Sequence, residues 1–339
     1  MSAGQRKVIM DVDTGIDDAL GIMLAVGSGS CDILGITTVN GNVSMQQATT
    51  NTFKILQLID RTDIPVFAGA DAPLVREPRF EHSVHGNDGI GGALTEMQVE
   101  QQVQPQAAHE FMIEQIMSHP GEITLILTAP LTNVALAIQQ QPEIVANVKE
   151  IVIMGGAVNE YGNITPTAEY NMYVDPEAAK QVLNAGFANL VLVPLDVTRK
   201  VLLNNNHLGA LNRTAQPEIA VYVGQSTSAY MERYEQRNGV KACAMHDPLA
   251  VAAALYPDVI STTLYHVDIE TNSDLCDGQT VCDFQNRLGK QPNVQVALTV
   301  NHIAFFKIFL ESLSNLKATE PVASVELELI ENAEQISLK

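Results

Sequence analysis

Five short apolar runs recur in the first two hundred residues of the chain. They occupy positions 7–12, 32–39, 122–129, 150–156 and 188–196. Each is rich in Val, Ile and Leu and nearly continuous, whereas a strand with one solvated face alternates apolar and polar residues. We therefore predict five strands that are buried on both faces, as in a parallel sheet.

Amphipathic segments with helical spacing lie between these runs, for example at 46–60 and 131–145. Segment 175–186 has a proline near its start and a glycine at its end, which is typical of a helix. Alternation of strands and helices predicts an α/β fold: an open, mostly parallel sheet wound with helices on both faces, with a Rossmann-like core. Ligands of such sheets bind beyond the carboxyl ends of the strands.

The second part of the chain is more helical. Helices are expected at 216–236 and 246–257, followed by further strands within 266–300 and one more helix. No Ser/Gly-rich linker or run of charge separates a second domain. We expect a single domain over residues 1–318 and a loosely packed acidic tail over 319–339.

Composition and charge narrow the classes of function. Of the 339 residues, 46% are hydrophobic and 17% charged, which fits a soluble globular protein, and the net charge is −20. This charge disfavours nucleic acids and anionic membranes as partners and suits a neutral small molecule or a cation, although solubility alone explains it equally well. The four cysteines form no C-x-x-C pair, and neither a signal peptide nor a membrane-length apolar run is found. We expect a cytoplasmic protein without disulfides.

Four aspartates lie within eight residues at the end of the first predicted strand: Asp11, Asp13, Asp17 and Asp18. Burying unpaired carboxylates together is costly. A divalent cation, the N-terminus of the next helix, or simple solvation could each account for them. Asp17 and Asp18 are well placed in a first helical turn, so capping is the simpler explanation for either one alone. Capping of this one helix, however, does not require all four aspartates.

Two other kinds of site begin with a similar cluster but fit this sequence less well. An EF-hand needs Gly at its sixth position and Glu at its twelfth, but Ile16 and Ile22 stand there. A magnesium-dependent phosphatase of the haloacid-dehalogenase type also begins with a strand and D-x-D. The later acidic pair and lysine of that family have no convincing counterpart here, and the net charge would repel phosphoesters.

Six motifs occur in an order that resembles the inosine-uridine-preferring nucleoside hydrolase family. They are "DVDTGIDDA" (11–19), "TTVNGN" (37–42), "HGNDGIGG" (85–92), "TAPLTN" (128–133), "IMGGAVNEYGNITPTAEYNMYVDPEAA" (153–179) and "HDPLAVA" (246–252). The resemblance extends from about residue 7 to about residue 315. Thr14 replaces a frequent proline, and Ala129 a frequent glycine. Neither change removes an expected ligand.

The resemblance implies a calcium-dependent enzyme that hydrolyses the N-glycosidic bond of ribonucleosides. Ca²⁺ takes six to eight oxygen ligands in flexible geometry, which leaves room for a ribose diol and a water, so Ca²⁺ is expected rather than Mg²⁺. The implied metal ligands are the carboxylates of Asp13, Asp18 and Asp247 and the carbonyl of Thr128. The implied substrate contacts are Asp17 and Asn171 to the ribose hydroxyls, Asn163 and Glu169 to the 5′-hydroxyl, Asn42 beside the metal-bound water, and Met154 against the sugar.

The catalytic assignments combine this resemblance with chemistry. Asp13, as ligand and water acceptor, is the expected general base, and His246, next to Asp247, is the expected acid for the leaving base. His85 could close over the base or be an ordinary polar loop residue. Tyr230 and Tyr234 share a helix face, which more often means packing, yet a tyrosine from this region closes over the base in the family, so Tyr234 is a further candidate.

The family resemblance also bears on the preferred base and on the oligomeric state. The chain has no tryptophan, whereas purine-specific members of the family stack the base between tryptophans and lack the histidine that His246 matches. A broad or pyrimidine-leaning preference is therefore expected. Related enzymes are dimers or tetramers, so a homodimer or homotetramer is expected. A non-catalytic ribose-binding protein is the remaining alternative, although binding alone requires neither His246 nor Asp13.

Overall fold

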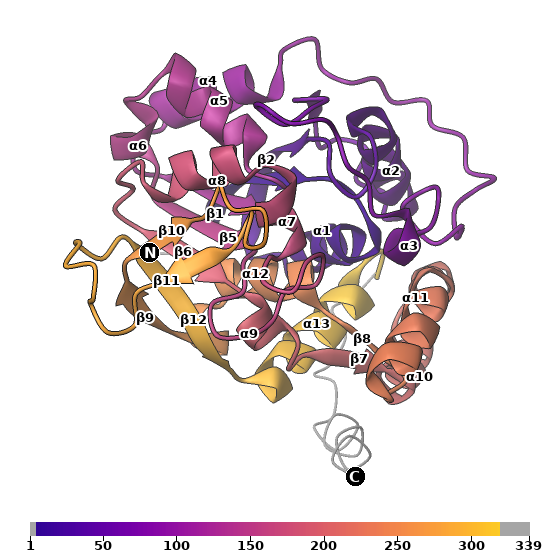
Figure 1. Ribbon diagram of the computed structural model, residues 1–339. Helices are drawn as coiled ribbons and strands as arrows, with labels where there is room; N and C mark the ends of the chain where they lie inside the picture. Colours follow the sequence, from indigo (N-terminus) through magenta and orange to yellow (C-terminus); the bar gives the residue numbers. More distant parts are fainter. Residues whose placement is uncertain (1–4, 319–339) are drawn as a thin grey trace.

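The central element of the computed structural model, which describes residues 5–318, is an eight-stranded sheet (Figure 1). In spatial order its strands are β3 (Val66–Ala68), β2 (Cys31–Thr38), β1 (Arg6–Val12), β4 (Ile123–Leu127), β5 (Glu150–Met154), β6 (Leu190–Val193), β12 (Val294–Val300) and β9 (Ile260–Tyr265). All neighbours are parallel except β12 and β9. The predicted open, mostly parallel sheet is confirmed.

Both faces of this sheet are buried, which explains the continuous apolar runs. Along β1, Val8, Met10 and Val12 belong to one hydrophobic cluster, while Ile9 belongs to another. Strands β4 and β5 divide their side chains between the same two clusters. Because successive residues of a strand point to opposite faces, burial of both faces requires apolar residues at every position.

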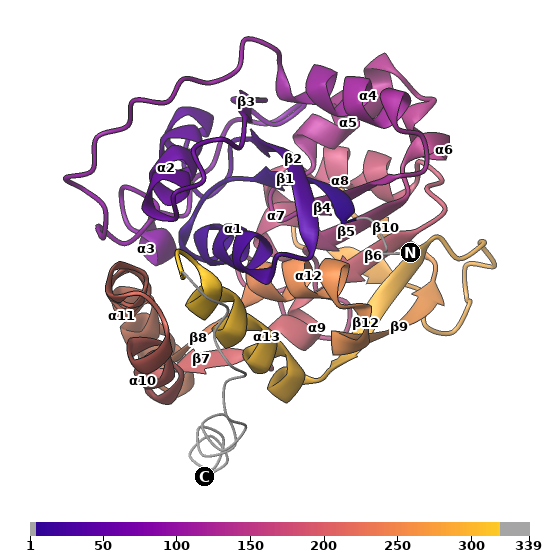
Figure 2. The same ribbon diagram turned by 180° about the vertical axis from the view of Figure 1, so that it is seen from behind.

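Helices cover both faces (Figures 1 and 2). The first cluster includes residues of α1 (Ile16–Ser28), α2 (Met45–Leu58), α10 (Asn205–Thr214), α11 (Pro217–Asn238), α12 (His246–Leu255) and α13 (His302–Asn315). The second includes residues of α4 (Ala108–Ser118), α5 (Thr132–Gln140), α6 (Ile144–Asn147) and α8 (Pro176–Leu183). Short elements complete the chain: α3 (His82–His85), α7 (Tyr170–Val174), α9 (Leu195–Thr198), a 3₁₀ turn (Pro257–Val259), and the pairs β7 (Leu202–Asn204) with β8 (Ala242–Ala244) and β10 (Val267–Ile269) with β11 (Thr280–Cys282).

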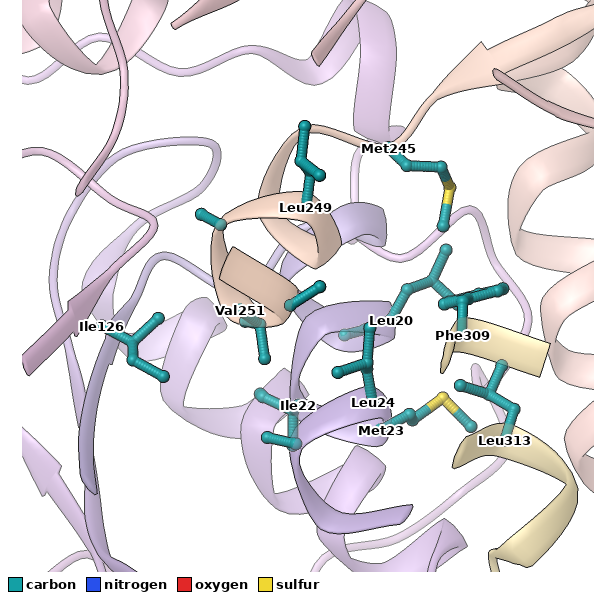
Figure 3. Close-up of a cluster of buried hydrophobic side chains, with 14 of the residues drawn as sticks. Leu20, Ile22, Met23, Leu24, Ile126, Met245, Leu249, Val251, Phe309 and Leu313 are labelled. Carbon is teal, nitrogen blue, oxygen red and sulfur yellow. The ribbon is translucent and has the colours of Figure 1, made fainter. Parts of the chain in front are cut away.

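Helix α1 lies in the interior, packed against α12 and α13. Its residues are buried from Ile16 to Ala25, because it presents apolar side chains on all sides. Figure 3 shows Ile22 next to Val251 of α12, and Leu20 next to Phe309 of α13. This packing brings the N-terminus of α12 close to that of α1, although more than two hundred residues separate them in sequence.

Several elements differ from the expected ones. The helix expected at 131–145 is interrupted between α5 and α6, where Pro142 cannot continue a helix. Strands β3 and β9 were not predicted, since β3 has only three residues and β9 is largely exposed. The expected acidic tail lies outside the described residues. Within 5–318, no helix combines the length and apolar character needed to cross a membrane.

Candidate active site

The site lies where the strand order of the sheet reverses. Strands β1 and β4 are neighbours, while the strands that follow each of them lie on opposite sides. Side chains beyond the carboxyl ends of such strands line a crevice. Asp13 directly follows β1, and Thr128 directly follows β4. The Thr128 hydroxyl donates a hydrogen bond to Asp18 Oδ1 (2.8 Å), which ties the end of β4 to the first turn of α1.

Three buried carboxylates meet beside this crevice. One oxygen each of Asp17, Asp18 and Asp247 lies within 4.8 Å of the others. Asp17 and Asp18 are in the first turn of α1, and Asp247 is in the first turn of α12. The helix dipoles favour negative charge there but do not cancel the repulsion between carboxylates. Capping accounts for part of Asp18 only, whose Oδ2 accepts a hydrogen bond from Gly15 N (2.9 Å).

These carboxylates can hold a metal ion. Among residues 5–318, no lysine or arginine forms an ion pair with any of the three. Asp17 Oδ1 is buried without a hydrogen-bond partner. Burial, followed by the charge of Asp18, raises the pKa of Asp17 to about 7, and burial with the neighbouring aspartates raises the pKa of Asp247 well above its usual range. A bound cation would remove this repulsion, so the donor set fits a hard metal ion.

Asp13 is held next to this group by the residues that follow β2. Its carboxylate accepts hydrogen bonds from Asn42 N (2.6 Å) and Asn42 Nδ2 (3.2 Å). Burial, and next the charge of Asp18, raises its pKa well above the usual range. Gly41 leaves room for it, because a Cβ there would collide with the Asp13 carboxylate. The structure thus groups Asp17, rather than Asp13, with Asp18 and Asp247, and the roles of Asp13 as ligand and base stay predictions.

A pocket of about 400 Å³ opens above the carboxylates. It brings together nearly all residues singled out from the sequence, while Asp13 and Asp18 are fully buried beside it. The sequence-predicted residues that line it are Asp17, Asn42, His85, Thr128, Met154, Asn163, Glu169, Asn171, Tyr234, His246 and Asp247.

The polar residues after β5 are fixed by their own hydrogen bonds. The Glu169 carboxylate accepts from the backbone N–H groups of Gly156 (2.9 Å) and Asn171 (2.9 Å) and caps α7. Asn171 Nδ2 donates to the Thr128 carbonyl (3.0 Å). Asn163 Oδ1 accepts from Tyr170 N (2.9 Å). These contacts hold the side chains in one orientation, with unused polar groups available to a ligand.

Two buried imidazoles complete the pocket. His246 Nδ1 lies 2.7 Å from Thr198 Oγ1, and His85 Nδ1 accepts a hydrogen bond from Ile16 N (3.1 Å). Burial lowers the pKa of each histidine to about 3, so both rings are neutral near pH 7. His85 also lies 3.9 Å from Asp17 Oδ1. His85 can therefore donate through Nε2–H, and His246 can do the same in the tautomer in which the Thr198 hydroxyl donates to Nδ1.

Other lining residues were not found from the sequence. Arg199 donates to the carbonyls of Tyr161 (2.8 Å) and Gly162 (3.0 Å), and its guanidinium lies 4.0 Å from the centre of the Tyr161 ring. Arg233 of α11 also faces the pocket. Thr198, which contacts His246, was also missed. The one available sign of its role was its position shortly after β6, because β6 ends at the same edge of the sheet.

These features define an α/β protein with a polar pocket above a group of buried carboxylates that could hold a metal ion. The sequence model of the family described as "Inosine-uridine preferring nucleoside hydrolase" matches residues 8–307. The chain belongs to this family, and the predicted resemblance and enzyme class are confirmed.

Relatives match over nearly the whole chain. The inosine-uridine preferring nucleoside hydrolase of Crithidia fasciculata is 36% identical, over 92% of this chain and 98% of its own length. The pyrimidine-specific ribonucleoside hydrolase RihB of Escherichia coli O157:H7 is 33% identical, over 91% of this chain and 96% of its own length. The solved structure "Plant nucleoside hydrolase - PpNRh1 enzyme" superposes with a TM-score of 0.86 at 32% identity, over 91% of this chain and 99% of that chain.

Proposed function

We propose that this protein is a calcium-dependent hydrolase that cleaves the N-glycosidic bond of ribonucleosides to ribose and free base. The observation that carries the proposal is the Asp17–Asp18–Asp247 group at the base of a pocket that also contains His246. Such a group fits a cation that chelates the cis-diol of ribose, and the pocket volume of about 400 Å³ is adequate for a nucleoside.

The donor set supports Ca²⁺ over Mg²⁺, because several carboxylates and a carbonyl suit a large, flexible coordination shell. The proposed protein ligands are Asp18 and Asp247 of this group, the Thr128 carbonyl, and Asp13, whose charge acts on both of these aspartates. Asp17 is then left to bind the ribose. When bound, Ca²⁺ supplies chelation of the ribose diol and lowers the pKa of a coordinated water. The Thr128 carbonyl already accepts one hydrogen bond from Asn171, and its second lone pair stays free for a cation.

The sugar is proposed to bind through the polar groups at the carboxyl edge of the sheet. Asp17 would accept hydrogen bonds from the ribose hydroxyls, and Asn171 would donate to them. Asn163 and Glu169 would bind the 5′-hydroxyl. Met154 would pack against the ring. The fixed hydrogen bonds of Glu169 and Asn171 support this role, because they pre-organise both side chains before the ligand arrives.

In the proposed reaction the bond between C1′ and the base nitrogen breaks, and its electron pair leaves with the base. The sugar becomes oxocarbenium-like and is stabilised by the surrounding carboxylates. Asn42 positions the attacking water, Asp13 takes its proton, and the water oxygen bonds to C1′. His246 donates a hydrogen bond from its N–H to the departing base, which then takes up one proton while Asp13 gives up the proton it accepted, so no net proton is consumed. His85 and Tyr234 are proposed to close over the base.

A substrate assay with a chelation step tests this proposal. Uridine, cytidine and inosine are incubated with the protein and released ribose is measured, before and after EDTA and after adding back Ca²⁺ or Mg²⁺. We expect ribose from at least one nucleoside, loss of activity with EDTA, and recovery with Ca²⁺. Phosphate release from phosphomonoesters with Mg²⁺ would instead support the phosphatase alternative. Binding without turnover would support a ribose-binding protein.

We further propose a broad or pyrimidine-leaning base preference, a cytoplasmic location and a homodimer or homotetramer. The names of the two enzyme relatives support the preference, since one is inosine-uridine preferring and the other pyrimidine-specific. Comparison of kcat/KM over the same substrate panel tests the preference. Sedimentation velocity tests the assembly, and a monomer at micromolar concentration would contradict it.

A further inference from the structure

One arginine at the pocket has an unused hydrogen-bond donor. Arg233 lies on α11, and its Nη1 is buried without a hydrogen-bond partner. Among residues 5–318, no carboxylate forms an ion pair with it, whereas Arg76 and Arg199 each have acidic partners. A guanidinium is always charged and can only donate, and a buried unpaired donor is costly. The structure therefore holds Arg233 ready for an acceptor that the protein itself does not supply.

The position of Arg233 indicates where this acceptor belongs. Tyr230, Arg233 and Tyr234 follow i, i+3, i+4 spacing on one face of α11, and all three line the pocket. Helix α11 packs against α3, which carries His85, and the charge of Arg233 contributes to the lowered pKa of His85. The side of the pocket formed by α11 and α3 therefore comes from different elements than the segment from Met154 to Asn171, which is proposed to face the sugar.

Resting on the proposed function, we propose that Arg233 donates a hydrogen bond to the keto oxygen of the leaving base, at C4 of a pyrimidine or C6 of a purine. As the N-glycosidic bond breaks, its electron pair stays on the base and spreads onto this oxygen. Arg233 stabilises that charge until the base takes up a proton on a ring nitrogen. A charge-assisted hydrogen bond of this kind strengthens as the charge develops, so it favours the transition state over the bound substrate.

The same contact discriminates between bases. An amino group at this position, as in cytosine and adenine, places donor against donor and leaves the guanidinium unpaired. Sites that hydrogen-bond one group reject an analogue without it more strongly than apolar pockets reject a change of size. Uridine is therefore favoured over cytidine, and inosine over adenosine, through Arg233.

The test compares inosine with purine riboside, which has a C6–H in place of the keto oxygen and an unprotonated N1. Arg233→Gln removes the charge, and Arg233→Lys keeps the charge but loses the planar fork. Arg213→Gln, an exposed change of the same charge on α10, is the control. We expect Arg233→Gln to lower kcat/KM for inosine about a hundredfold and to leave purine riboside nearly unchanged, by analogy with loss of one donor to a developing anion.

The variants separate the possible outcomes. Arg233→Lys is expected to show an intermediate loss that is again confined to inosine, and Arg213→Gln no loss. An equal loss on both nucleosides, or no loss on inosine, would overturn the assignment. If the unmodified protein released no ribose from any nucleoside, the proposed function itself would fail. Thermal unfolding of each variant identifies folding defects. If Arg233→Gln does not fold, the comparison of inosine with purine riboside in Arg233→Lys tests the assignment.

Discussion

At the scale of single residues, the hydrogen bond between Thr198 and His246 decides which imidazole nitrogen faces the pocket. Thr198 Oγ1 lies 2.7 Å from His246 Nδ1, and burial keeps the ring neutral. If the hydroxyl donates, Nδ1 is the acceptor and Nε2 carries the proton. A neutral histidine in this tautomer can donate to a leaving base, so Thr198 is a positioning residue for the proposed acid.

Replacing Thr198 by valine tests this arrangement, because the side chain keeps its shape and loses the hydroxyl. We expect Thr198→Val to lower kcat for uridine about tenfold, which corresponds to the loss of one hydrogen bond. Turnover of p-nitrophenyl riboside should hardly change, since its leaving group departs without a proton. Thr198→Ser should restore the activity. A similar loss on both substrates would mean that the threonine only supports the fold.

Gly41 offers a second test at this scale, because a Cβ there would collide with the Asp13 carboxylate. We expect Gly41→Ala to displace Asp13 and to reduce kcat for every nucleoside by about a hundredfold, as for loss of a general base. Gly224→Ala is the control, since a Cβ at that position on α11 meets no atom within 4 Å. Unaltered turnover in Gly41→Ala would argue against Asp13 as the base.

At the scale of elements, the N-terminus of α10 is closed by a reciprocal pair of hydrogen bonds. Asn204 Oδ1 accepts from His207 N (3.3 Å), and His207 Nδ1 accepts from Asn204 N (3.2 Å). The His207 ring also stacks on Phe306 of α13, with the ring centres 3.7 Å apart. Burial, followed by the charge of His302, lowers the pKa of His207 to about 4, because a charge on the buried ring would be poorly solvated.

This cap makes stability depend on pH. The unfolded chain binds a proton at His207 with a pKa near 6.5, whereas the folded protein does so only near 4. Stability is therefore present above pH 6.5 and is lost as the pH falls toward 4. Relative to His207→Gln, the protein should lose about 2 kcal/mol of unfolding free energy between pH 7 and pH 5. Urea unfolding of both proteins checks this, and parallel pH curves would contradict it.

At the scale of the whole molecule, the carboxylate group joins two segments that lie far apart in the chain. Asp17 and Asp18 begin α1, Asp247 begins α12, and the two helices pack together in the core. A cation bound by the folded protein alone stabilises it by mass action. The proposed site would therefore contribute to the stability of the fold as well as to the proposed chemistry.

Removal of the metal should lower the melting temperature. At a Ca²⁺ concentration one hundred times the dissociation constant, the expected stabilisation is about 2.7 kcal/mol. Asp247→Asn should reduce or abolish the shift, while Asp258→Asn, an exposed aspartate in the 3₁₀ turn, should retain it. Differential scanning calorimetry with Ca²⁺ and with EDTA measures this shift in the unmodified protein and in both variants. Identical melting temperatures under the two conditions would contradict a metal site in the folded protein.

The sequence by itself determined the sheet and the edge that carries the site. Strands buried on both faces must be apolar at every position, so β1, β2, β4, β5 and β6 were recognisable from composition alone. Polar residues directly after such strands, Asp13 and Thr128 among them, must lie at the carboxyl edge because the strands are parallel. Motif order, read through the family resemblance, was enough to predict about half of the residues that line the pocket, with Asp13 and Asp18 beside them.

Only the tertiary structure decided which of these groups meet. The grouping of Asp17 with Asp18 and Asp247, and the contact of Thr198 with His246, depend on distances between elements far apart in sequence. The unpaired donor of Arg233 could not be predicted either, because on α11 the residue resembles any solvated helix position. Local periodicity specifies which face of an element is buried, but only the packing of helices against one another sets the distance between their ends.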